Sequence, residues 1–193
     1  MVRFSSLLVG FACASALGAA PAKKKKAPPP PPPPPPVTAP TPKVREALSD
    51  TTLTLLASAE SAQTFGASDS GGLRPDPSKA IASDFVRGAP GATLDSTQLD
   101  ALRSVLYDEK SFRFGQDVSR CRFVPNLSVQ LRAGIDTLET LISFSCNQVL
   151  FVMGKPGGRW IPQGTYDVKP ARAKLLEFAK ATLPTDPVLR GLK

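Results

Sequence analysis

Cys121 and Cys146 are the two residues of this chain whose chemistry is most readily assigned from sequence. A third cysteine, Cys13, lies in the N-terminal segment. In an oxidising compartment the two later thiols would form a disulfide, and closing a loop of about 25 residues stabilises a domain by on the order of 3 kcal/mol. Two free buried thiols are the alternative. A zinc site is not expected, because two thiolates without histidine or a second cysteine pair do not complete a tetrahedral ligand set.

The chain contains no histidine. This removes the commonest general base, the usual partner of a nucleophilic serine or cysteine, and the commonest nitrogen ligand for metals. Carboxylates or lysines could still catalyse hydrolysis, but the adjacent acidic pair Asp108-Glu109 is expected only to solvate the end of a helix. The glycine-rich segment 154–158 lacks the Gly-Lys-Ser/Thr ending of a P-loop and is expected to be a turn. We therefore predict no catalytic, metal-binding or cofactor-binding residue.

A candidate contact surface follows that turn. Arg159 and Trp160, the only tryptophan, precede Tyr166 on a segment that also contains proline and glycine. Arginine, tryptophan and tyrosine contribute most of the binding energy in many protein interfaces. The alternative, which we favour for the tryptophan, is that Trp160 folds back and caps the core.

Helices should provide one layer of the domain. Asp95 followed by Gln98 is the pattern of a capping box, so a helix is expected to begin here, with Arg103 facing solvent. Its buried stripe should comprise Leu99, Leu102, Val105 and Leu106. An earlier helix is expected after Ser49, and a last helix from Pro170, which suits a first helical turn.

Alternating apolar residues predict a β-hairpin between residues 127 and 146, with one apolar face and a turn near residues 133–136. The run 149–153 is apolar at every position, which suits a central strand covered on both faces. Segments 62–67 and 81–87 are weaker strand candidates. The resulting fold class is α+β, with an antiparallel sheet of about five strands and helices packed on one face.

The net charge of +8 is concentrated outside the predicted domain. Residues 1–43 contain six basic residues and no acidic one, which leaves 18 basic and 16 acidic residues in 44–193. A folded domain so nearly balanced lacks the clustered positive charge that binding to a phosphate backbone requires. Nucleic acid is therefore not an expected partner.

The first 22 residues have the three parts of a secretory signal peptide. Arg3 precedes an apolar run, and Ala20-Pro21-Ala22 fits the small-x-small cleavage rule. Two alternatives remain open. The leader could stay uncleaved and anchor a cytoplasmic domain, since the lysines that follow it oppose translocation, or Cys13 could be acylated.

Residues 23–43 read as a linker that joins the leader to a single domain over residues 44–193. Nine consecutive prolines, Pro28 to Pro36, predict a stiff polyproline II spacer of about 28 Å with no packed structure, although a proline-binding groove could also recognise it. Four lysines, Lys23, Lys24, Lys25 and Lys26, could hold the near end of this disordered tail on anionic phospholipid.

The segment Cys121-Arg122-Phe123-Val124-Pro125, with Phe144-Ser145-Cys146 after a strand and a turn, resembles a pattern found in a group of small exported bacterial domains. The pattern reads Cys-x-Phe-x-Pro followed by Phe-x-Cys. In that group the second part often begins with a further cysteine, where this chain has Ser143. The resemblance implies export, an α+β fold and a single bridge, and it brings no known activity.

The sequence therefore predicts an exported protein, periplasmic or secreted, whose α+β domain stands on a basic polyproline stalk. We expect a non-catalytic role, namely binding an unknown protein or a component of the cell envelope. A histidine-independent hydrolase of the cell envelope and a cytoplasmic domain on an uncleaved anchor are the alternatives.

Overall fold

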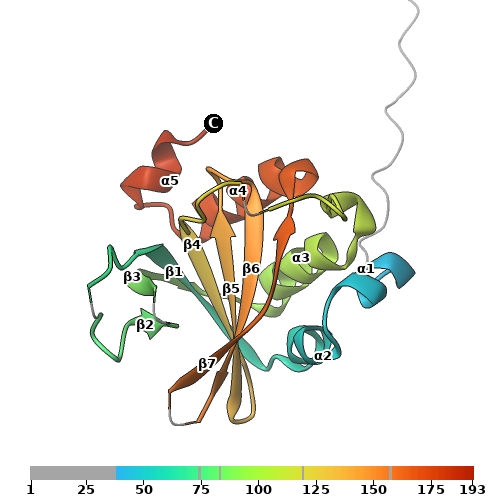
Figure 1. The fold of residues 1–193 in the computed structure, drawn as a ribbon, viewed down its shortest axis with the longest axis horizontal. Coiled ribbons are helices and arrows are strands. Elements are labelled where there is room, and N and C mark those ends of the chain that lie inside the picture. The colour runs from blue at the N-terminus through green and yellow to red at the C-terminus, as the bar shows by residue number, and fades with distance from the viewer. Residues whose placement is uncertain (1–37, 74, 83, 119, 157) are drawn as a thin grey trace, which may run out of the picture. The chain divides into compact units, whose positions relative to one another are not determined.

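A computed structural model describes residues 38–193 apart from 74, 83, 119 and 157 (Figure 1). The predicted signal peptide (1–22), Cys13, the four lysines and the nine prolines lie outside the described residues. The helices are α1 (Pro42–Ala47), α2 (Asp50–Ser58), α3 (Ser96–Tyr107), α4 (Arg172–Thr182) and α5 (Pro187–Gly191), with short 3-10 turns η1 (Glu109–Ser111) and η2 (Lys169–Ala171). The strands are β1 (Ser61–Asp69), β2 (Ala80–Ile81), β3 (Phe85–Thr93), β4 (Leu127–Ala133), β5 (Asp136–Ser143), β6 (Gln148–Lys155) and β7 (Arg159–Asp167).

The strands form one sheet in the order β2-β3-β1-β4-β5-β6-β7, and every neighbouring pair is antiparallel. The α+β class is thus correct, and the expected count of about five strands is too low. One omitted strand is β7, in which Pro162 and Gly164 weaken the strand pattern. An edge strand tolerates proline, and a register shift opposite Phe151 and Val152 accommodates these residues. The predicted strand 81–87 is divided between β2 and β3.

The main core lies between the helices and one face of the sheet. Leu127, Val129 and Leu131 of β4 share it with alternate residues of β5 and β6, which confirms the predicted hairpin and its apolar face. The helices contribute buried residues from α2, α3 and α4 to the same cluster, among them Leu56, Leu102, Leu106, Leu175 and Ala179. Strand β6 lies between two neighbours and is buried on both faces over most of its length, as predicted.

Capping residues define both the start of α3 and the end of α2. The predicted capping box is present, with Asp95 accepting from the Gln98 amide at 2.8 Å and Gln98 accepting from the Asp95 amide at 3.1 Å. Arg103 does not simply face solvent. Its guanidinium donates hydrogen bonds to the carbonyls of Leu56, Ala57 and Ala59, because the last carbonyls of α2 have no partner within that helix.

Within residues 38–193, the four gaps aside, no helix combines the length and the apolar composition needed to cross a lipid bilayer.

Burial raises the pKa of both tyrosines of the chain, Tyr107 and Tyr166. An unfolded tyrosine ionises near pH 10, so between that pH and the higher folded pKa the folded state binds more protons than the unfolded state. Stability is therefore fully present below about pH 10 and falls as the pH rises through the folded pKa. Since both groups are affected, native protein should show no tyrosinate absorbance at the ordinary pKa.

A spectrophotometric pH titration, with circular dichroism recorded in parallel, checks that the pKa of both tyrosines is raised. Tyr166→Phe should reduce the alkaline loss of stability, while costing about 1 kcal/mol at neutral pH because the hydroxyl donates to the Ala47 carbonyl at 2.9 Å. A tyrosine that ionises near pH 10 while the circular dichroism stays native would contradict the burial of these rings.

Candidate functional site

The sheet face opposite the helices carries buried polar side chains. Alternation along β4 and β5 places Ser128, Gln130 and Glu139 on this face. Glu139 and Ser128 are wholly inaccessible to solvent, and Gln130 is 9% exposed. A buried carboxylate is costly unless it is paired and hydrogen-bonded, so the surroundings of Glu139 decide whether this face is stable.

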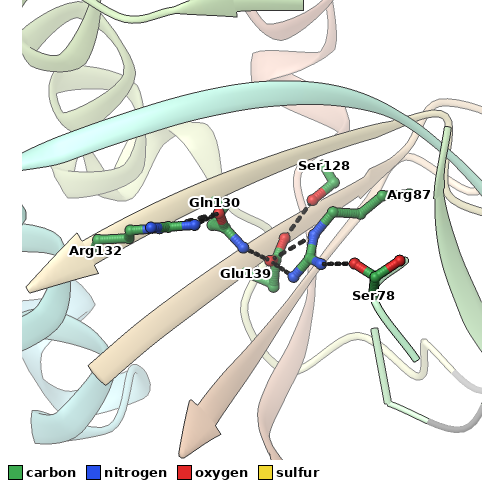
Figure 2. Close-up of polar contacts among 6 residues, drawn as sticks. All are labelled: Ser78, Arg87, Ser128, Gln130, Arg132 and Glu139. Atoms are coloured by element: carbon green, nitrogen blue, oxygen red, sulfur yellow. Dashed lines mark hydrogen bonds and ion pairs between the residues drawn. The ribbon is translucent and has the colours of Figure 1, made fainter. Parts of the chain in front are cut away.

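Arg87 of β3 supplies the counter-charge (Figure 2). Its Nε donates to Glu139 Oε1 at 3.0 Å, and its Nη2 donates to the same oxygen. Gln130 Nε2 also donates to Oε1, at 2.9 Å, while the Ser128 hydroxyl donates to Oε2. Both carboxylate oxygens are therefore satisfied, by donors from two other strands.

The polar chain extends beyond the ion pair at both ends (Figure 2). At one end Arg87 Nη1 donates to the Ser78 carbonyl at 3.4 Å, which ties the segment before β2 to the pair. At the other end Gln130 Oε1 accepts from Arg132 Nε at 3.2 Å and from Arg132 Nη2 at 3.1 Å. Five side chains and one carbonyl thus form a continuous network across β3, β5 and β4.

Two aromatic rings enclose the guanidinium of Arg87. Its Cζ lies 5.7 Å from the centroid of the Phe65 ring on β1 and 5.6 Å from that of the Trp160 ring on β7. Three strands separate β1 from β7 in the sheet. Both rings can reach one guanidinium only because the sheet curls around it, so this face is concave. Cation–π attraction adds to the ion pair at this point.

A second, smaller core fills the concave face beside the ion pair. Ile81 of β2, Leu141 of β5 and Val152 of β6 are its fully buried members. Phe85 and Phe123 pack against it, with ring centroids 5.6 Å apart in an edge-to-face arrangement. Strand β2, the start of β3 and the segment before β4 therefore cover this part of the sheet.

The predicted disulfide Cys121–Cys146 is present, with Cα atoms 5.8 Å apart. It joins the segment that carries Phe123 to the turn between β5 and β6. In the same segment Arg122 pairs with Asp69 at 2.6 Å, next to the end of β1. The backbone amide of Gly71 and the Arg122 guanidinium hold the pKa of Asp69 below its usual value. The bridge and this ion pair keep the cover of the second core in place.

The three residues predicted as a contact surface do not lie on one surface. Trp160 packs over Gly154, where an added Cβ would lie 2.8 Å from the indole, and it faces the second core. It has therefore folded back, as the alternative interpretation held. Tyr166 is on the helix side, where it packs edge-to-face with Phe112. Arg159 remains exposed at the start of β7.

Sequence reasoning did not identify Arg87 or Glu139 as a pair. One signal was available, because the apolar run 149–153 predicts cover on both faces of β6. Glu139 is the cross-strand partner of Val152, so a strand covered on both faces implies that its neighbour's carboxylate is buried too. Nothing in the spacing identifies Arg87 as the counter-ion, since it lies 52 residues from Glu139. After Arg87 its strand contains one proline and four glycines or alanines, which weaken the strand pattern.

Removing the charge of Glu139 should strongly destabilise the fold. Glu139→Gln leaves the Arg87 guanidinium, whose side chain is only 11% exposed, without a counter-ion, so the free energy of unfolding should fall by about 3–5 kcal/mol. The control is Asp136→Asn, which breaks the Lys155–Asp136 pair at 3.1 Å. There the side chains are 40% and 29% exposed, so the loss should stay below about 1 kcal/mol.

Urea denaturation of the single variants Arg87→Met and Glu139→Gln and of the double variant Arg87→Met/Glu139→Gln measures the coupling energy between the two side chains. The double variant should lose clearly less than the sum of Arg87→Met and Glu139→Gln, because each single change leaves one buried group unpaired. Additive losses would show that the two side chains do not depend on each other.

Within the described part of the chain, no group of three or more cysteine, aspartate, glutamate or histidine side chains is arranged to hold a metal ion. Comparisons with protein-family models, with curated proteins and with solved structures find no match. The function is therefore inferred from the residues of this chain.

Proposed function

We propose that this chain is an exported binding domain, periplasmic or secreted, which stands on its lysine- and proline-rich stalk and binds a protein or an envelope component. The observation that carries the proposal is the Cys121–Cys146 bridge. Stable disulfides belong mainly to oxidising compartments, and the leader-like residues 1–22 would bring the domain there. The resemblance of the segments around both cysteines to small exported domains supports the same location.

The buried charges support binding rather than catalysis. A general acid or base must reach a substrate within hydrogen-bond distance. Both oxygens of Glu139 are already occupied by Arg87, Gln130 and Ser128, and the carboxylate is wholly inaccessible. We therefore assign this ion pair to the stability of the concave face and not to a reaction.

The contact surface we propose lies where the turns of the two hairpins meet, and we call it the hairpin-tip surface: Ile135, Lys155 and Arg159. Both turns lie at the same end of the sheet (Figure 1), and the Lys155–Asp136 pair joins them. Ile135 is 82% exposed. Arg159 is also exposed, and it is the cross-strand partner of Lys155 at the end of β6 and β7. The charge of Lys155 is balanced by Asp136, so Arg159 supplies the positive charge beside exposed Ile135. This combination suits a protein partner that presents an acidic group next to an apolar contact. The four stalk lysines would add attraction to anionic phospholipid.

Fractionation of a Gram-negative host that expresses the chain with its own leader tests the proposed location. The chain should be recovered outside the cytoplasm with a new N-terminus near Lys23, and Cys121 and Cys146 should resist alkylation until they are reduced. A variant without residues 2–22 is the control and should remain in the cytosol with both thiols reactive. Full-length wild-type chain in the cytosol with both thiols reactive would contradict export.

Site-specific photo-crosslinking in intact cells tests the hairpin-tip surface. A photoreactive residue at position 135 should give a discrete adduct, and Arg159→Glu should reduce its yield because the charge facing an acidic partner is reversed. The matched control is position 177 on α4, another exposed site far from the hairpin turns in sequence. Equal adduct patterns at 135 and 177, or a yield unaffected by Arg159→Glu, would contradict this surface.

A further inference from the structure

The concave face is not filled along its whole length. Beyond the ion pair it leaves a small pocket of about 170 Å³. Its lining residues come from β1, β3 and β4 and are Ser61, Ala62, Gln63, Thr93, Gln130 and Arg132. Cross-strand pairing brings them together, since Ser61 is opposite Arg132, and Gln63 is opposite both Gln130 and Thr93.

Arg132 is the charged member of this lining, and although the residue is exposed, its guanidinium is oriented by two hydrogen bonds to buried Gln130. Gln130 must direct Nε2 toward Glu139, because only the amide nitrogen can donate to a carboxylate. Its Oε1 therefore faces Arg132 and accepts from Nε and Nη2. Arg132 is thus oriented by a side chain that is itself held by the Arg87–Glu139 pair. Such a preorganised cation loses little conformational freedom when it binds an anion.

The guanidinium of Arg132 retains donors for a ligand. Of its five N–H groups, two are used by Gln130, and the other three have no hydrogen-bond partner among the described residues. The carboxylate of Glu139 is neutralised by Arg87, and the pocket lining contains no aspartate or glutamate. The side chain of neighbouring Glu60 is exposed, and no ion pair joins it to Arg132. The lining therefore presents one positive charge together with hydroxyl and amide groups.

We propose that this pocket binds a carboxylate group through Arg132, assisted by Ser61, Gln63 and Thr93. A guanidinium matches a planar carboxylate with two parallel hydrogen bonds. The single positive charge suits a carboxylate better than a phosphate, which carries up to two negative charges at neutral pH. A volume of about 150 Å³ holds a benzene-sized molecule, so the pocket accepts a small acid or the end group of a larger ligand. The pocket has this chemistry whether or not the chain is exported, and it does not use the hairpin-tip surface.

An NMR titration of the whole isotope-labelled chain with propionate tests the pocket, and propionamide is the uncharged control of the same shape. Propionate should shift the Arg132 Nε–H signal and the side-chain amides of Gln63 and Gln130 in a saturable way, with a dissociation constant on the order of millimolar. Propionamide should leave these signals nearly unchanged. Equal shifts with both compounds, or tighter binding of inorganic phosphate than of propionate, would overturn the assignment.

Substitutions separate the role of Arg132 from a general effect of charge. Arg132→Gln should weaken propionate binding by about tenfold or more, and Arg132→Lys should weaken it less because the charge remains without the planar fork. Arg190→Gln removes an exposed arginine of α5 outside the pocket and should leave binding unchanged. A wild-type affinity in Arg132→Gln, with the rest of the spectrum preserved, would overturn the proposal.

The same titration distinguishes two sources of the carboxylate. A dipeptide with a free C-terminus that binds more tightly than both propionate and its own C-terminal amide would identify a chain end as the ligand. A dipeptide that binds no better than propionate would identify a free small acid. Either result supports the pocket, whereas equal binding of the dipeptide and its amide would contradict carboxylate recognition.

Discussion

The curl of the sheet depends on one buried ion pair, between Arg87 of β3 and Glu139 of β5. Glu139 has no access to solvent, so its charge must be compensated inside the protein. Arg87 provides that compensation only if β3 lies over β5, three positions away in the sheet order β2-β3-β1-β4-β5. The rings of Phe65 on neighbouring β1 and of Trp160 on the distant edge strand β7 then both lie against the guanidinium. Pairing these charges and bending the sheet are one structural requirement.

The curled sheet separates two hydrophobic cores, one on each face. The larger core joins the helices to the outer face of the sheet and provides most of the apolar burial. The smaller one, around Ile81, Leu141 and Val152, needs the cover that the disulfide and the Arg122–Asp69 pair hold in place. Because the small core and the ion pair occupy only part of the concave face, the end near Arg132 stays open to a ligand. The network that stabilises this face therefore also orients Arg132 beside the pocket.

The sequence predicted those features that depend on local pattern. The capping box at Asp95, the hairpin 127–146, the doubly covered strand β6 and the disulfide all follow from spacings within a few residues or from cysteine chemistry. Strand β7 was missed because Pro162 and Gly164 oppose a strand, and pairing with β6 overrides that preference. The Arg87–Glu139 pair was missed because it joins residues 52 positions apart, and only the curl of the folded sheet brings them together. Trp160 and Tyr166, which proximity in sequence had grouped on one surface, lie on opposite faces of the sheet because the register shift opposite Phe151 and Val152 falls between them.

The position of the Arg87 side chain is the most direct test of this structure, and NMR of the whole chain can measure it. We expect a resolved Arg87 Nε–H signal that exchanges slowly with water, with nuclear Overhauser contacts to the rings of both Phe65 and Trp160. Contacts to both rings require β1 and β7 to approach the same guanidinium. An Arg87 side chain that exchanges as fast as free arginine and contacts neither ring would show that the sheet is not closed around the ion pair.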